Sequence, residues 1–211
     1  MIDFDDAARH ISAVLRMAFR TEDESWRRDI DNSISGVFQS FWAAAFVAPF
    51  LMLAYYVAER AARTAPNFDD SFFTKAPSGL LLISEFVAYA VIWAISLWAL
   101  AMIAKKLGAQ KNYSTIVVLF NWAQPLGLFL FVIPAAAFLL SNSFELFAIL
   151  QLPIIAFNVF IFWNILRRTL PLDVGSAVAI IALIYLIELG VHTTVQSLAV
   201  GAYQIVAAPS G

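Results

Sequence analysis

The sequence predicts an all-α fold: a polytopic membrane helix bundle in which five transmembrane helices are preceded by an amphipathic N-terminal interfacial helix. Three observations predict it. Hydrophobic residues make up 62% of the 211-residue chain and charged residues only 13%, the apolar residues gather in five long stretches, and the basic residues fall almost entirely in alternate loops. Because soluble proteins carry about 25% charged residues, this composition indicates an integral membrane protein.

Each of the five apolar stretches is long enough to cross a bilayer. A transmembrane helix needs roughly 20 apolar residues to span about 30 Å of hydrocarbon. The segments outside the stretches are too small to bury cores of their own. We therefore expect one transmembrane domain, 37–202, between a cytoplasmic or interfacial segment, 1–36, and a short external tail, 203–211. The predicted spans are 37–58, 79–104, 115–140, 144–166 and 174–202.

The positions of lysine and arginine predict the orientation. Cytoplasmic loops of membrane proteins are enriched in these two residues. If the N-terminus lies inside, the only basic residues outside are Arg60, Arg63 and Lys75, of 13 in the chain. We therefore expect the protein in the cell membrane, the inner or cytoplasmic one, with its N-terminus cytoplasmic and its C-terminus external or periplasmic.

The N-terminal segment has the pattern of an interfacial helix. On a helical wheel, Arg9, Arg16 and Arg20 form a narrow stripe opposite a wide apolar face. Such a helix can bury its apolar face at the acyl boundary while its arginines contact anionic headgroups. The alternative is that the helix packs on the cytoplasmic loops of the protein itself. The apolar face consists of Phe4, Ala7, Ala8, Ile11, Val14, Leu15, Ala18 and Phe19.

Prolines within three of the spans predict helix kinks. Proline removes an amide donor and clashes with the preceding turn. We expect bends at Pro49, Pro134 and Pro153, and a kink or break of the third span near Pro125. The three residues 141–143 leave room only for a tight turn, so the third and fourth spans should form an antiparallel hairpin.

Two acidic residues lie within apolar spans. An acid at the bilayer centre costs about 3 kcal/mol on insertion scales, so such residues usually face the bundle interior or a wet cavity. Glu188 is midway along the fifth span, and His192 and Gln196 follow it at one-turn intervals on the same face. Glu85 is nearer the end of its span and could reach headgroup water. A pair of Glu188 and His192 could neutralise itself, relay protons or supply two metal ligands, which alone are a weak metal signal.

Neutral polar residues complete the candidate intramembrane polar site. Asn121 and Gln124 lie in the third span, beside its predicted break. Amides at such positions commonly join helices by hydrogen bonds worth about 1 kcal/mol. The alternative is that they line a polar permeation path or a ligand pocket.

Composition and motifs narrow the classes of function. The chain lacks the short motifs of metalloproteases, serine hydrolases and nucleotide-binding proteins, so nothing positive indicates an enzyme. With no cysteine, disulfides and thiolate metal sites are excluded. The net charge of −2 argues against a nucleic-acid partner. We predict no cofactor and no metal; the expected partners are the lipid bilayer and either further copies of the chain or other membrane proteins.

The chain resembles the Yip family of five-span membrane proteins between about Ser35 and Gly201. The likeness rests on the amphipathic N-terminal segment, on five spans with the N-terminus inside, on the sequence Asn121-Trp122-Ala123-Gln124-Pro125-Leu126, and on the basic, proline-containing linker 167–177. Eukaryotic members act around Rab GTPases in membrane traffic. Their acidic, tyrosine- and proline-containing sequence is missing here, so the resemblance transfers no functional residue.

Two main hypotheses of function follow. The first, which the resemblance favours, is a non-enzymatic scaffold or membrane-organising protein that acts through its N-terminal helix and through contacts between helices. The alternative is a small ion- or proton-coupled transporter or channel that uses Glu188 and His192. A lipid-handling enzyme is a third and weaker hypothesis.

Overall fold

The computed structural model describes residues 4–20, 22, 24–64 and 72–207, and in these ranges it contains helices and turns but no strand. Five of its helical stretches are long and apolar enough to cross a membrane. The predicted fold class is confirmed: the protein is a multi-pass, all-α membrane protein. The long helices are α4 (Ala43–Arg63), α5 (Ser78–Lys106), α6 (Tyr113–Ser141), α7 (Phe144–Thr169) and α8 (Val174–Ala207).

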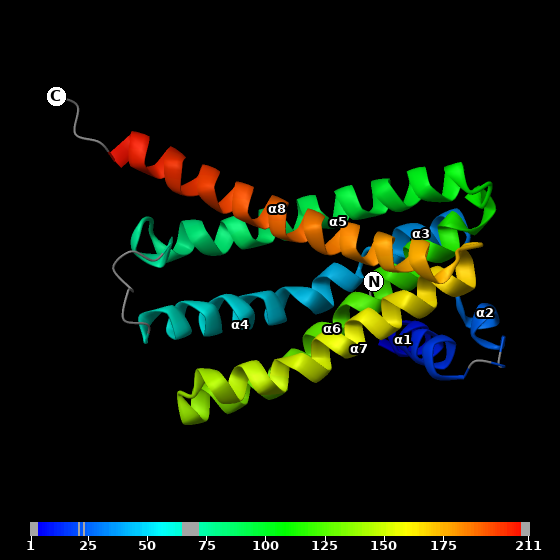
Figure 1. Cartoon of the computed structure of the whole chain (residues 1–211), viewed down its shortest axis with the longest axis horizontal. Helices are drawn as coiled ribbons and strands as arrows, with labels where there is room; N and C mark the ends of the chain where they lie inside the picture. The colour runs from blue at the N-terminus through cyan, green and yellow to red at the C-terminus, as the bar shows by residue number, and fades with distance from the viewer. Residues whose placement is uncertain (1–3, 21, 23, 65–71, 208–211) are drawn as a thin grey trace.

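The long helices run side by side along the long axis of the molecule (Figure 1). Helix α6 is central and packs on α7 and α4, while α8 packs mainly on α5. Three short helices lie at one end, beside the turns that join α5 to α6 and α7 to α8 (Figure 1). All segments predicted to be cytoplasmic therefore meet at the same end. The short helices are α1 (Phe4–Phe19), α2 (Trp26–Asp29) and α3 (Ile34–Ser40).

Local side-chain chemistry explains where α7 and α8 begin. Asn142 has φ 53° in the turn after α6, a left-handed conformation that asparagine tolerates. The Leu146 N–H then donates to Ser143 Oγ over 3.1 Å and caps α7, so the predicted hairpin is confirmed. At α8 the Ser176 N–H donates to Asp173 Oδ1 over 2.7 Å. The hydrogen bonds from Ser176, led by this backbone bond, hold the pKa of the Asp173 carboxyl below its ordinary value.

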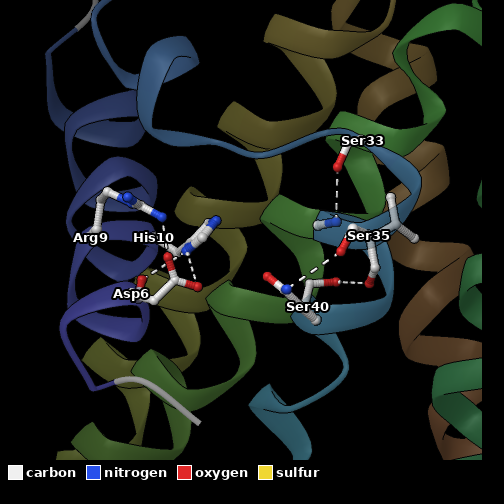
Figure 2. A network of polar contacts seen from close by, with 9 residues as sticks. Asp6, Arg9, His10, Ser33, Ser35 and Ser40 are labelled. Atoms are coloured by element: carbon white, nitrogen blue, oxygen red, sulfur yellow. Dashed lines mark hydrogen bonds and ion pairs between the residues drawn. The ribbon is translucent and has the colours of Figure 1, made fainter. Parts of the chain in front are cut away.

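The first predicted span, 37–58, lies within the apolar helical stretch Ile34–Arg63, which a turn at Phe41 and Trp42 divides into α3 and α4. Helix α3 ends at Ser40, and α4 starts at Ala43 after a turn. Ser40 Oγ donates to the Val37 carbonyl over 2.7 Å, the type of side-chain bond that competes with continued helix. Serines cluster along α3, where Ser33 Oγ also accepts the Gly36 N–H over 3.1 Å (Figure 2).

Helix α6 is continuous, so of the kink or break predicted near Pro125 the structure excludes the break. Pro125 and Pro134 both lie inside α6, Pro49 lies inside α4 and Pro153 inside α7, and each helix continues past its proline. Bends at these four residues stay a prediction. The interruption expected in the third span instead occurs in the first, between α3 and α4.

The N-terminal helix α1 is confirmed, and part of its apolar face lies against protein, while Phe4, Ala8 and Phe19 of the same face are exposed. Val14 is fully buried and Ala18 nearly so, because α1 packs on α6, α7 and α2. The expectation that this face lies in lipid is therefore wrong for these residues, and α1 contacts the spans themselves. Arg16 forms an ion pair with Asp29 of α2, and contact of its partly exposed side chain with headgroups stays a prediction.

The other two arginines of the predicted stripe are exposed. Arg9 pairs with Asp6 on the same helix (Figure 2), and Arg20 follows the end of α1. Contact of these two side chains with headgroups stays a prediction. Next to them His10 is buried and stacks on Trp122 of α6, with ring centroids 5.4 Å apart. This stacking pair fixes the position of α1 on α6.

Candidate functional site

A cluster of three polar side chains joins α5 to α8. His192 Nε2 lies 2.8 Å from Glu85 Oε2, and Gln196 Nε2 donates to the other oxygen of the same carboxylate. The sequence interpretation paired His192 with Glu188 on its own helix. The structure corrects this, because the hydrogen-bonded partner of His192 is Glu85 on the neighbouring helix. Glu85 therefore does not extend alone to headgroup water.

Glu188 instead lines a cavity of about 350 Å³ bounded by α4, α5, α6, α7 and α8. Gln124 of α6 lines the same cavity, so the structure brings together two of the residues predicted for the polar site. The volume is within the range of about 300–1,000 Å³ typical of small-molecule sites. The cavity is not sealed beside Glu188, because this residue is exposed in the bundle.

The spacing of residues along each helix explains why further polar side chains line the cavity wall. On α5, Tyr89 and Ser96 are seven residues apart, with Trp93 between them, and all three line the cavity. On α7, Gln151 and Asn158 have the same seven-residue spacing. Residues at this interval share one face of a helix. Helices α5 and α7 therefore each contribute a polar face to the cavity, whereas the α4 residue in its lining is the apolar Leu51.

Several of these wall atoms have hydrogen-bonding capacity that the protein does not use. Tyr89 OH, Ser96 Oγ and Gln151 Oε1 are buried, and no described residue bonds to them. An unpartnered buried polar group costs about 1–3 kcal/mol, so such groups are usually explained by a ligand, water or a functional role. Three of them on one cavity that also holds a carboxylate indicate a site for a polar or cationic occupant.

A close approach of two helices shapes one wall of the cavity. Gly127 of α6 faces the Asn158 amide of α7, and a Cβ added at Gly127 would lie 2.7 Å from Asn158 Cγ. A larger residue at this position would require the Asn158 side chain to move. The small residue lets α6 and α7 pack closely, as small residues do between membrane helices, and it holds Asn158 at the cavity.

Asn121 belongs to the packed core rather than to this cavity. Its side chain is fully buried; its Nδ2 donates to Ser40 Oγ over 2.8 Å, and its Oδ1 accepts from Trp93 Nε1 over 2.7 Å. These bonds join α6 to α3 and to α5. Of the two alternatives weighed for Asn121, helix packing is the one that fits.

Sequence reasoning missed Tyr89, Ser96, Gln151 and the buried His10. The first three are polar residues inside apolar spans, and their seven-residue spacing to other wall residues was a usable signal. The residues singled out were the embedded acids, their neighbours on α8, and Asn121 and Gln124 in the third span. For His10, no pattern in the sequence indicates a stacking partner on α6. Among the described residues, no group of three or more His, Asp or Glu side chains could hold a metal ion.

Comparisons of this chain with protein-family models, with curated proteins and with solved structures found no match. The functional argument therefore depends on the geometry of the cavity and of the α5–α8 cluster. Together they place a carboxylate, several free hydrogen-bonding atoms and a carboxylate–imidazole pair within the membrane-spanning part of the bundle. This set can bind a small cation or exchange a proton.

Proposed function

We propose that this membrane protein moves protons or small cations, with Glu188 as the binding carboxylate of the cavity. The observation that carries the proposal is that Glu188 shares its cavity with Tyr89 OH, Ser96 Oγ and Gln151 Oε1, none of which has a partner among the described residues. Together these groups supply negative charge and oxygen ligands, which suit a desolvated cation. Embedded acids of this kind mark ion and proton pathways in membrane proteins.

The Glu85–His192 pair supports a path along α8. His192 is one helical turn from Glu188 on the same helix, and it contacts Glu85 on α5 at 2.8 Å. Histidine exchanges protons near neutral pH. Successive carboxylate, imidazole and carboxylate groups therefore lie along one helical seam, from the cavity toward the end of the bundle that holds the C-terminus.

A flux assay in liposomes tests the proposal. Purified protein is reconstituted with an internal pH dye or cation dye, and a potassium gradient with valinomycin sets the membrane potential. We expect wild type to pass protons or Na⁺ faster than protein-free liposomes, and Glu188→Gln to return flux to the protein-free rate. Glu145→Gln is the matched control, because Glu145 is exposed at the start of α7. Wild type that passes neither ion would contradict the proposal.

A second candidate function is a membrane-organising scaffold similar to the Yip family. In this proposal the protein lies in the inner membrane, with its N-terminal end in the cytoplasm. The observation that favours it is the assembly of α1 and α2 on the bundle: Trp26 is fully buried, while Arg27 and Arg28 are exposed beside it. A fixed basic surface could bind a partner. Crosslinking in native membranes tests this; a strictly monomeric protein without crosslinked partners would contradict it.

A further inference from the structure

A second hollow lies between α4 and the hairpin of α6 and α7. Its volume is about 660 Å³. The α4 side is built from small residues, including Ala58, Ala61 and Ala62, and the opposite side from Phe131, Phe144 and Phe147. Because alanine side chains cannot reach the phenylalanines, an apolar groove stays open between the helices. Val57, one of its lining residues, is buried in a cluster with Phe138.

The groove belongs to the part of the protein that crosses the bilayer, so hydrocarbon is its natural occupant. Lipid tails are the solvent around a membrane helix. The volume of the groove is within the range that holds a small ligand, about 300–1,000 Å³. Thr64 is the polar residue of the groove lining. Arg60, which precedes the lining residue Ala61 on α4, donates to Asn142 Oδ1, in the turn before α7, over 2.7 Å. The guanidinium thus bridges the same helices that form the two walls.

The charge of Arg60 selects the headgroup. The ion pair of the neighbouring Arg63 is with Glu59, whereas the bond from Arg60 is to a neutral amide. A guanidinium has five donors in a planar fork that matches phosphate oxygens. We propose that this groove is a specific site for one phospholipid with an anionic headgroup, its acyl chain between the alanines and phenylalanines and its phosphate on Arg60.

Native mass spectrometry of lipids retained by the protein tests the proposal. The protein is equilibrated in nanodiscs that contain equal amounts of phosphatidylglycerol and phosphatidylcholine with the same acyl chains. It is then released from the nanodiscs in the mass spectrometer. We expect wild type to retain one phosphatidylglycerol in preference to phosphatidylcholine. The expected preference is about fivefold, which corresponds to ~1 kcal/mol for one arginine near an anionic headgroup.

Two variants and their controls distinguish binding of the lipid's acyl chain from binding of its headgroup. Ala58→Phe fills the groove and should abolish retention of this lipid, whereas Ala45→Phe, at an exposed position of the same helix, should not. Arg60→Gln keeps a donor for Asn142 and should bind both lipids equally; Lys106→Gln, at the opposite end, should leave the preference unchanged. Arg60 is at the bundle surface, so its variant tests the headgroup even if Ala58→Phe does not fold. Equal retention of both lipids by wild type, or retention by a folded Ala58→Phe variant, would overturn the proposal.

Discussion

His192 Nε2 lies 2.8 Å from Glu85 Oε2 and joins two helices through residues 107 positions apart in the chain. A hydrogen bond between charged or ionisable groups is stronger than one between neutral groups. The Glu85 side chain is about 20% exposed and that of His192 about 42%. The pair is therefore screened only in part by what surrounds the bundle. This contact holds the C-terminal half of α8 against α5.

We expect Glu85→Ala to loosen the pairing of α5 and α8. The change removes both the His192 contact and the bond from Gln196, which together should lower the free energy of unfolding by about 1–2 kcal/mol. The chain has no cysteine, so spin labels can be placed cleanly on introduced cysteines at Ile83 and Leu198. Their distance distribution, measured by pulsed electron paramagnetic resonance, should broaden. It should stay narrow in Glu145→Ala; an unchanged distribution in Glu85→Ala would contradict this role.

Asn121 is expected to be the polar residue on which the stability of the bundle depends most. Asn121→Ala removes its bonds to Ser40 and Trp93 and leaves both partners buried, so the free energy of unfolding should fall by about 2–3 kcal/mol. Ser40→Ala should cost about 1 kcal/mol, and the double variant should lose less than the sum. Urea unfolding in detergent micelles measures all three.

Asn164→Ala is the control for Asn121. The Asn164 amide donates to the Phe160 carbonyl of its own helix over 2.9 Å, so it joins no second helix. Its replacement should change stability by less than about 0.5 kcal/mol. If Asn121→Ala were as mild as this control, the assignment of Asn121 to the packed core would be wrong.

Docking of α1 on the spans predicts that its buried face matters for stability. Met17 is fully buried, and Met17→Ala should lower the free energy of unfolding by about 2–3 kcal/mol through the cavity it leaves. Ser12→Ala, on the exposed face, should have little effect. If α1 merely rested in the lipid interface, both variants would unfold like wild type, which the same urea titration would show.

The fold could be predicted closely from the sequence, because crossing a bilayer demands long apolar helices whatever their packing. The rotation and pairing of the helices could not, since hydrophobic patterns in membrane spans do not identify neighbours. Glu188 was singled out as an embedded acid, and it lines the cavity. The partner of His192 turned out to be Glu85, because α8 turns the His192 side chain toward α5. The interruption at Phe41 and Trp42 also had no proline to indicate it.

The environment of the N-terminal helix is a second feature that could not be predicted from the sequence. An apolar face opposite an arginine stripe suits a lipid surface and a protein surface equally well. What decides between them is the shape of α6, where Trp122 offers a flat ring to His10, and the ion pair of Arg16 with Asp29. Neither contact has a local signature in the chain.

The most direct test of the central claim is to modify Glu188 chemically and follow ion flux. A hydrophobic carbodiimide reacts with protonated carboxyl groups in apolar surroundings, and peptide mass spectrometry locates and quantifies the adduct. We predict that Glu188 is modified before Glu145 and that flux in reconstituted liposomes falls in proportion to the fraction of Glu188 modified. Full flux after complete modification of Glu188 would contradict the claim that its carboxylate binds the transported ion.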